Sequence, residues 1–421
     1  MNMRKIARNI KLGRNVDRND RPAERWMVMA RVALGQSKMV TRPIAGFFHI
    51  IVYAGFVIIN IEVLEIVIDG IFGTHRVFAK PLGSLYNYLI GSFEILAISV
   101  FIACAIFLIR RSVIRIKRFR NPELNGWPRK DATIILLTEI ALMTLFLTMN
   151  ASDYLLQHKG APHYIMAGSY PVSSQIAYFL SGISTETLIA IERFCWWLHI
   201  AGIILFLNYL PFSKHFHILL AFPNTWYSNL EKKGKFNNVE AVTNEVKLMM
   251  DPSAVPPPVD PAAPPARFGA KDIQDLTWKN LMDAYSCTEC GRCTSVCPAN
   301  ITGKKLSPRL IMMKTRDRAE EVGKNINQNK SFVDDGKSLL RDYITEEELR
   351  ACTTCNACVE ACPVSISPLD IILQQRRYLI MEESSAPQEW NAMFSNTENN
   401  FAPWKFSPDE RDKWAEEMKS L

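Results

Sequence analysis

Apolar residues dominate the chain from residue 44 to about 220, whereas the remainder up to residue 421 is polar with Pro-rich patches. Four stretches in the first half stay apolar on every side: 44–72, about 86–109, about 132–149 and about 187–210. A helix that crosses a bilayer needs about 20 such residues, and buried helices of soluble proteins seldom lack a polar face over that length. The pattern therefore predicts four transmembrane helices.

The polar half contains a Pro-rich run and short helical patterns, and no strand pattern stands out. The run S-A-V-P-P-P-V-D-P-A-A-P-P-A-R, at residues 253–267, has a composition that favours an extended, semi-rigid chain. From about Lys271 onward, short helical patterns surround two cysteine-rich blocks. We expect a mainly α protein in which the Pro-rich run separates a membrane domain from a second helical domain.

Basic residues are distributed unevenly between the segments that connect the predicted spans. Eleven Lys and Arg precede the first span and eight follow the second, but the other two loops together hold only Arg76, Lys80 and Lys159. By the positive-inside rule, the N-terminus, the second loop and the polar half face the cytoplasm. This distribution accounts for the net charge of +7 without a nucleic-acid partner. The stretch E-R-W-M-V-M-A-R-V-A-L favours an amphipathic helix, on the inner membrane surface or in the cytosol.

Eight of the ten cysteines lie in two blocks, C-T-E-C-G-R-C-T-S-V-C-P (287–298) and C-T-T-C-N-A-C-V-E-A-C-P (352–363). Both spell C-x-x-C-x-x-C-x-x-x-C-P, the run of bacterial two-cluster ferredoxins, in which the fourth cysteine ligates the other cluster. We therefore assign one 4Fe–4S cluster to Cys287, Cys290, Cys293 and Cys362. We assign the second to Cys352, Cys355, Cys358 and Cys297.

Zinc and disulfide bonds are the alternatives for these thiols. Zinc sites usually draw two ligands from one C-x-x-C pair and two from a distant pair, whereas each block here supplies three closely spaced cysteines and a fourth before proline. The cytoplasmic position also disfavours disulfides. Cys104 and Cys195 lie in apolar stretches and are expected to be small core residues.

The two blocks are separated by 55 positions, from Cys297 to Cys352, with helical patterns between them. Over about residues 270–380 this arrangement resembles the helical ferredoxin domain of succinate dehydrogenase iron–sulfur subunits and of the small subunit of heterodisulfide reductase. The resemblance implies clusters that relay electrons in short steps and have no substrate of their own.

Among the seven histidines, His49 lies near the start of the first predicted span, His199 inside the fourth, and His217 just past it. On an unbroken helix, with Pro211 as the place for a kink, His199 and His217 would share one side and lie about 27 Å apart. His49 and His217 would then have the same depth near the inner surface. Because paired imidazoles can hold haem in a helical bundle, we expect a b-type haem between them. His215 is the alternative to His217, and a hydrogen-bonded core position is the alternative role for each histidine.

The Leu-His pair followed by P-F-S-K-x-x-H resembles the cytochrome b (gamma) subunit of respiratory nitrate reductase and the membrane subunit of heterodisulfide reductase, over about residues 44–225. In that family the last helix supplies one ligand to each of two haems, and an earlier helix supplies their partners ten positions apart. His49 matches the first partner, but the second would fall at Ile59, which cannot ligate iron. The resemblance thus implies one haem, and a second only if His199 pairs with an outer residue, for which the candidates are His75, His158 and His163.

Three acidic residues, Glu62, Glu65 and Asp69, are spaced to share one helix face toward the outer side. One interpretation is a proton path that serves quinol chemistry. The alternative is an outer helix end whose carboxylates pair with Arg76 or Arg193.

These features predict five regions: a basic cytoplasmic N-terminal segment (1–43), a four-helix transmembrane cytochrome b-like domain (44–225), a Pro-rich linker (226–269), a cytoplasmic helical two-cluster ferredoxin domain (270–380) and a C-terminal partner-docking tail (381–421). The sequence contains no C-C pair, Gly-rich dinucleotide loop or P-loop. Residues 402–405, A-P-W-K, resemble the N-P-W-G linker that joins ferredoxin domains to C-C-G modules in fused relatives, which implies a separate partner docking near this tail.

The expected function is electron transfer in a quinone-linked, heterodisulfide reductase-like complex of a bacterial or archaeal cytoplasmic membrane. The b haem would exchange electrons with quinone, and the two clusters would pass them to or from a cytoplasmic catalytic subunit, of the C-C-G type if the tail resemblance holds. Two rival functions are a membrane-anchored ferredoxin or scaffold without haem and a self-sufficient quinone-linked reductase. A nucleic-acid binder would need a basic cytosolic domain, whereas the charge here clusters beside the spans.

Overall fold

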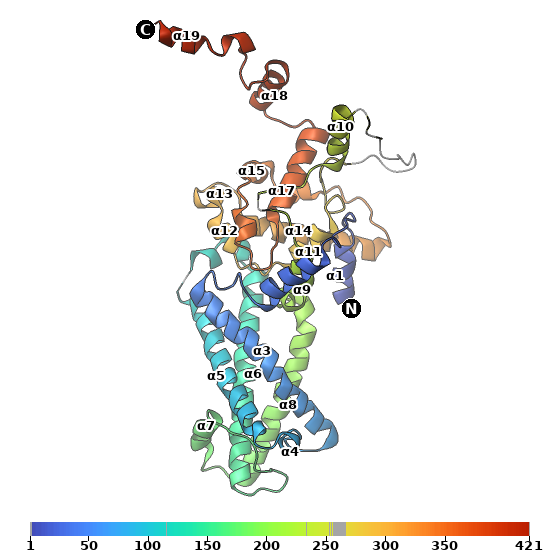
Figure 1. Cartoon of the computed structure of the whole chain (residues 1–421). Coiled ribbons are helices and arrows are strands. Elements are labelled where there is room, and N and C mark those ends of the chain that lie inside the picture. The colour runs from blue at the N-terminus through green and yellow to red at the C-terminus, as the bar shows by residue number, and fades with distance from the viewer. Residues whose placement is uncertain are drawn as a thin grey trace.

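A bundle of four long helices carries a cap of shorter helices at one end (Figure 1). This computed structural model describes residues 2–114, 116–232, 234–251, 253, 255 and 267–420. Among those residues there is no β-strand, only two isolated backbone bridges. The predicted mainly α fold is confirmed. Most of the Pro-rich run at 253–267 lies outside the described residues.

All four predicted spans are long helices: α3 (Pro43–Phe72), α5 (Leu85–Ser112), α6 (Trp127–His158) and α8 (Thr185–Tyr209). Each is long and apolar enough to cross a membrane, and at most 33% of its most apolar stretch is buried inside the protein. Large side chains such as Ile71, Phe194 and Leu205 point outward. An apolar surface of this extent is unfavourable in water but suits contact with lipid, whose tails are as apolar as leucine.

The fourth span ends before His217. At Leu210, α8 gives way to two 3-10 turns, Leu210–Phe212 and Lys214–Phe216, and α9 (His217–Trp226) begins a new helix. Pro211 cannot donate the backbone hydrogen bond that would continue α8, and the Ser213 hydroxyl accepts from the backbone N–H of His215 (3.0 Å). The prediction that His199 and His217 share one side of an unbroken helix is therefore wrong.

The cap is built from seven short or medium helices around the cysteine blocks: α11 (Trp278–Ser286), α12 (Arg292–Val296), α13 (Pro298–Ile301), α14 (Pro308–Asn329), α15 (Glu346–Arg350), α16 (Ala357–Glu360) and α17 (Pro368–Arg377). Thr277 and Thr345 begin α11 and α15 with reciprocal capping boxes, which satisfy otherwise unpaired N–H groups. Leu281, Ile311 and Ile371 are fully buried in the core between these helices.

The N-terminal segment ties the cap to the bundle. On α1 (Asn2–Ile10), Asn9 donates to the Tyr285 hydroxyl (2.8 Å). Arg14 then forms a backbone bridge with the cap, donating to Leu276 (2.7 Å) and accepting from Trp278 (3.0 Å). The predicted amphipathic stretch forms α2 (Pro22–Met29) and a following π-helical turn, Ala30–Leu34, and α2 packs against α9.

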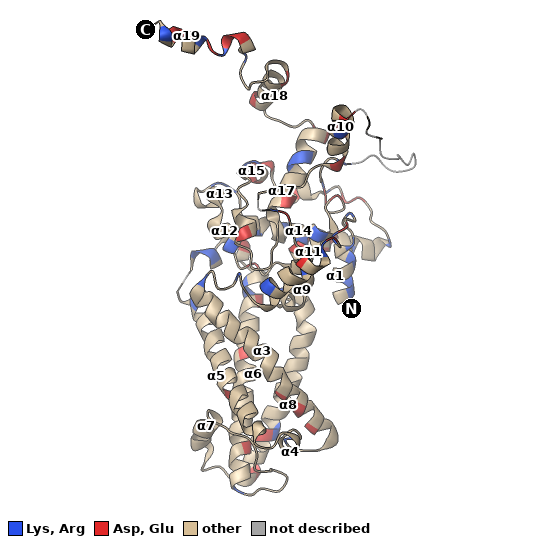
Figure 2. Ribbon diagram, in the orientation of Figure 1, with Lys and Arg blue, Asp and Glu red and all other residues tan. Residues whose placement is uncertain are grey.

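The remaining helices lie at the periphery. Two short helices, α4 (Ala79–Leu82) and α7 (Ser173–Leu180), lie at the end of the bundle opposite the cap, and α10 (Glu240–Met250) forms within the predicted linker (Figure 1). The tail, with α18 (Gln388–Asn400) and α19 (Lys413–Lys419), extends away from the cap and exposes Trp404 and Trp414. Lys and Arg gather where the bundle meets the cap (Figure 2).

Arg318 holds the insertion between the two cysteine blocks in place. Its guanidinium is fully buried and pairs with Asp272 (2.7 Å) and Asp335 (2.6 Å), and it also donates to the Lys337 carbonyl (2.7 Å). Removing one partner of a buried ion pair leaves the other partner's charge uncompensated. We therefore expect Arg318→Met to lower the free energy of unfolding by about 3–5 kcal/mol, measured by denaturation of the purified chain.

The matched control is Lys337→Ala, because Lys337 is half exposed and pairs with Glu321 on the surface. That variant should change stability by less than about 1 kcal/mol. Equal effects of the two substitutions would contradict a structural role for the buried pair.

Candidate electron-transfer site

The two cysteine blocks fold into the same local loop. Two residues after the first cysteine of each block, Glu289 (φ 57°) and Thr354 (φ 55°) have left-handed backbone, and two residues further on Gly291 (φ 70°) and Asn356 (φ 64°) do so again. Left-handed non-glycine residues are strained and persist where the surroundings enforce them, which is often at functional sites. The two C-x-x-C-x-x-C runs thus turn at matching positions.

The fourth cysteine of each block lies near the other block. Cys362 lines one small cavity, of about 30 Å³, together with Cys287, Cys290 and Cys293. Burial, and then the neighbouring Cys290, raises the pKa of Cys362 to about 11. Burial, and then Cys352 and Cys297, raises the pKa of Cys358 to about 12. Cys362 therefore lies near the first three cysteines of the other block, and Cys297 lies near Cys352 and Cys358. These are the two groups of thiols that the sequence assigned to separate clusters, although Cys358 also borders the first cavity.

The surroundings of the thiols suit a cluster bound by thiolates. Backbone N–H groups of Thr354 and Ile366 donate to the sulfurs of Cys352 (3.4 Å) and Cys362 (3.3 Å), and such hydrogen bonds are among the groups that tune iron–sulfur centres. Within the described residues, no three His, Cys, Asp or Glu side chains converge closely enough to hold a single metal ion. Burial also raises the pKa of Cys287 to about 12, so cluster binding must displace protons from these thiols.

Glu289 connects the first cysteine loop to the membrane domain. Its carboxylate pairs with Lys214, in the turn that follows α8, and with Arg316 of α14 (2.7 Å). Burial acts to raise the pKa of Glu289, but Arg316 and Lys214 outweigh it, so the pKa lies below its ordinary value. The Lys214 ammonium also donates to the Pro128 carbonyl at the start of α6 (2.6 Å). The contact between Glu289 and Lys214 was not predicted from the sequence. Its only signal there is that each charged residue lies inside a motif, Glu289 in the first cysteine block and Lys214 in P-F-S-K-x-x-H.

Arg309 makes a second connection between the cap and the bundle. This fully buried side chain of α14 pairs with Glu123 (2.8 Å) and donates to the Arg118 carbonyl (2.8 Å), both in the loop between α5 and α6. The guanidinium also lies against Gly291, where a Cβ atom would come within 2.5 Å of Nη1. Glycine at this position therefore permits both the left-handed loop and the close approach of the arginine.

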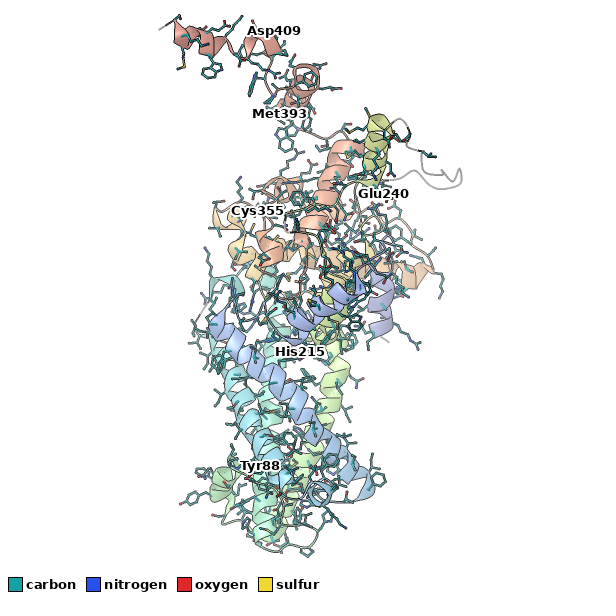
Figure 3. All side chains as sticks on the ribbon, viewed as in Figure 1. Tyr88, His215, Glu240, Cys355, Met393 and Asp409 are labelled. Carbon is teal, nitrogen blue, oxygen red and sulfur yellow. The ribbon has the colours of Figure 1, made fainter. Side chains whose placement is uncertain are left out.

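Three imidazoles gather at the end of the bundle next to the cap. The rings of His215 and His217 lie 5.5 Å apart, and burial, then His217 and His49, lowers the pKa of His215 to about 3. His217 Nδ1 lies 3.1 Å from the Lys214 carbonyl, whereas the buried Nδ1 of His49 has no hydrogen-bond partner. Figure 3 shows His215 at this junction. The structure thus brings His49 and His217 together despite the broken helix.

A large cavity lies between α3, α6 and α8, on the membrane side of these imidazoles. It has a volume of about 110 Å³, and its lining includes His199, Glu139 and His215, with Ile59 on the α3 wall. His199 is buried, and its Nδ1 lies 3.1 Å from the Leu142 carbonyl. None of the three outer histidines predicted as partners for His199 lines this cavity, all of them being described residues.

Those outer histidines have other contacts. Both ring nitrogens of His75 face protein groups, Nε2 at 3.0 Å from Asp153 and Nδ1 at 3.3 Å from the Ile165 N–H. The His163 ring lies beside that of His75 (5.7 Å), and His158 Nδ1 contacts the Tyr154 carbonyl. His75 could therefore ligate iron only by giving up one of its contacts.

The acidic face of α3 is paired with the loop that follows it. Arg76 binds Glu62 (2.9 Å) and Asp153 (2.8 Å) and donates to Asn150 (2.7 Å). Asp69 accepts from the Arg76 N–H (2.7 Å), and Glu65 from the Phe78 N–H (2.8 Å) and the Tyr86 hydroxyl (2.8 Å). The geometry favours the pairing interpretation over a proton path, with Arg76 rather than Arg193 as the partner, since Arg193 pairs with Glu192.

Comparison with known proteins identifies the cap. Residues 286–366 match the family model of the 4Fe-4S dicluster domain. Over 28% of the chain and 60% of the relative, the sequence is 31% identical to a subunit of the "Ferredoxin/F(420)H(2)-dependent CoB-CoM heterodisulfide reductase" of Methanosarcina acetivorans. The predicted resemblance of this domain to heterodisulfide reductase is confirmed.

Two other relatives match nearly the whole chain. It is 28% identical to "Probable iron-sulfur-binding oxidoreductase FadF" of Bacillus subtilis, over 97% of the chain and 57% of the relative. It is also 28% identical to "EtfAB:quinone oxidoreductase" of Syntrophomonas wolfei, over 96% and 55%. The chain thus spans just over half the length of these relatives. No solved structure matches it.

The domain match and the helices define the class of protein. The chain carries a two-cluster 4Fe–4S domain of the kind found in iron–sulfur oxidoreductases, joined to four helices suited to a membrane. It is an iron–sulfur electron-transfer protein of the oxidoreductase type.

We expect Glu289→Gln to raise the reduction potential of the cluster predicted at Cys287, Cys290 and Cys293, because Glu289 lies inside that cysteine block. Reduction adds negative charge, so removal of a neighbouring carboxylate favours the reduced state, by on the order of tens of millivolts. The potential would be measured by redox titration followed by electron paramagnetic resonance. Glu347→Gln, which alters an exposed pair with Lys305, is the control and should leave the potential unchanged.

The same junction predicts a dependence on pH. Because the folded pKa of Glu289 is lowered from 4.5, its stabilising contribution is complete above that pH and is lost as the pH falls through the folded value. The difference in stability between wild type and Glu289→Gln should therefore shrink in acid. A difference that stays constant down to the acid transition would contradict this assignment.

Proposed function

We propose that this chain is a membrane subunit that relays electrons between quinone and a partner oxidoreductase at the cytoplasmic face. The single observation that carries the proposal is that the first cysteine loop contacts the segment that contains the predicted haem ligand His217. Glu289, inside the first cysteine loop, is paired with Lys214, and one and three residues beyond Lys214 are His215 and His217. A redox centre on either side would therefore be held by adjoining segments. A relative named for quinone oxidoreduction supports the same chemistry.

The proposed cluster ligands are Cys287, Cys290, Cys293 and Cys362 for the cluster nearer the bundle. Cys352, Cys355, Cys358 and Cys297 would hold the other. When bound, the clusters supply one-electron transfer. The protein's part is to exclude water, donate backbone N–H groups to the sulfurs and hold the first loop against the membrane domain.

The proposed haem ligands are His49 and His217, with His215 as the alternative to His217. In support, the unpartnered Nδ1 of His49 is buried beside this pair, and the sequence resembles a cytochrome b family. A bound haem would supply one-electron exchange within the bilayer. The Lys214 carbonyl would fix the His217 ring through Nδ1 and leave Nε2 for iron.

The side of the membrane and the partner also belong to this proposal. The positive-inside rule places the cap in the cytoplasm, and the tail from residue 381, with its exposed Trp404 and Trp414, is the proposed docking segment for a catalytic subunit of the C-C-G type.

Serine substitutions test the crossed ligand assignment. Cys362→Ser should impair the cluster held by the first block, and Cys297→Ser the one held by the second, because in each case the fourth ligand comes from the other block. The two cluster signals would be resolved by electron paramagnetic resonance, alongside iron per chain. If Cys362→Ser impaired the same cluster as Cys355→Ser, the assignment would be wrong. Cys104→Ser, in the membrane core, is the control that should leave both signals intact.

The haem proposal is tested by the reduced spectrum of the purified chain. We expect the bands of a b-type haem in the wild type and their loss in both His49→Leu and His217→Leu, with iron–sulfur content unchanged. A wild-type chain without such bands would favour the membrane-anchored ferredoxin instead. Turnover of a soluble acceptor by the single chain with quinol would favour the self-sufficient reductase.

A further inference from the structure

We propose that the cavity around His199 is the binding site for the quinone ring, with the quinol hydroxyl donating to His199 Nε2. This inference rests on the proposed function and adds to it the location of the substrate and the residues that contact it. The site lies in the bilayer, between α3, α6 and α8, and not at the cap.

The size and lining of the cavity fit such a ligand. Pockets for small molecules commonly have apolar walls with a few placed polar groups, and this cavity, of about 110 Å³, is close in size to the roughly 150 Å³ of an engineered cavity that binds benzene. Val52, Phe56 and Leu142 represent its apolar lining, and His199 and Glu139 are ionisable groups on its wall. A quinone has the same division, with an apolar ring and tail and two oxygen atoms that need hydrogen-bond partners.

The tautomer of His199 is set by its neighbour. A backbone carbonyl can only accept, so Nδ1 donates to Leu142 across 3.1 Å and carries the proton in the neutral ring. Nε2 is then an acceptor, which matches the hydroxyl of a quinol. The residue is 1% exposed and lines the cavity, so a donor to Nε2 would lie inside the cavity.

If His199 ligated a haem iron, a second imidazole would be needed close to it, and the described lining of this part of the cavity contains none. Facing helix α3 presents Ile59 there, and the other histidine in the described lining is His215. Phe206 follows His199 by seven residues, or about 10 Å along α8, and its ring packs against that of His215 with centroids 5.4 Å apart. The two imidazoles therefore lie toward opposite ends of the cavity, and an iron bound to one is out of reach of the other.

The same arrangement accounts for the redox step. Oxidation of the quinol releases two electrons and two protons. One proton passes from a hydroxyl to Nε2 of His199, and the second passes from the other hydroxyl to the carboxylate of Glu139. The redox centres proposed above, when bound, would accept the two electrons one at a time, and quinone reduction would be the reverse. The end of the cavity at His215 adjoins the junction with the cap, so the proposed haem ligands lie between the ring at His199 and the cap.

The test uses the purified full chain in lipid nanodiscs with 2-heptyl-4-hydroxyquinoline N-oxide, a fluorescent quinone analogue that is quenched on binding. We expect His199→Leu to weaken binding at least tenfold while haem and iron per chain stay at wild-type values. His199→Gln, which keeps a hydrogen-bonding group, should recover part of the affinity. Ile59→Phe, which reduces the space from the opposite wall, should also weaken binding. His158→Leu, at the exposed outer loop, is the matched control.

Two results would overturn the inference. Loss of one haem per chain in His199→Leu would make this residue a haem ligand, and unchanged analogue binding in both His199→Leu and Ile59→Phe would place the quinone elsewhere. The proposed function fails separately, if quinol does not reduce the clusters of the wild-type chain. Quinol reduction that persists unaltered in His199→Leu would instead refute the inference alone.

Discussion

The buried contact between Glu289, Lys214 and Arg316 is the interaction on which the arrangement of this protein depends. It links a cysteine loop in the cap to the turn that follows the last membrane helix, and it is supported by α1 and by the pair of Arg309 and Glu123, which also connect the cap to the bundle. A carboxylate buried at such a junction is tolerated because two cations compensate it. The same ionic contact fixes the orientation of the cap and places a charge beside a proposed redox centre.

Charged groups are used differently at the two ends of the bundle. At the cap end they connect domains, through Glu289 and through the pair of Arg309 and Glu123. At the opposite end the buried Arg76 gathers Glu62 and Asp153 and so closes the loop after α3 against α6. Between these ends the helices carry few charged residues (Figure 2) and are apolar enough to cross a membrane. The middle of the bundle is therefore the place where isolated polar groups, His199 and Glu139, call for a functional explanation.

The proposed route of electrons follows from this division. Quinone is soluble in the apolar middle of the bundle, the iron–sulfur domain is built for the aqueous phase, and the three imidazoles of His49, His215 and His217 lie between them. The helix break at Pro211 is essential to this layout, because it turns the chain after α8 so that His215 and His217 lie at the base of the cap. The relatives that match nearly the whole chain carry both parts, which indicates that the combination is used elsewhere as one unit.

The sequence by itself determined the four spans, the helical cap and the two-cluster domain, because hydrophobic length and C-x-x-C-x-x-C-x-x-x-C-P spacing are local properties. Local periodicity was insufficient at His199 and His217: it placed both on one side of an unbroken helix, and α8 ends at the turn that contains Pro211, which the sequence marked only as the place for a kink. Only the tertiary structure decided that Glu62, Glu65 and Asp69 are paired with residues 76–86 and Asp153, that Glu289 meets Lys214, and that Ile59 faces the cavity of His199. Each of these contacts joins residues from different elements, and the free energy that selects them arises only when the helices pack.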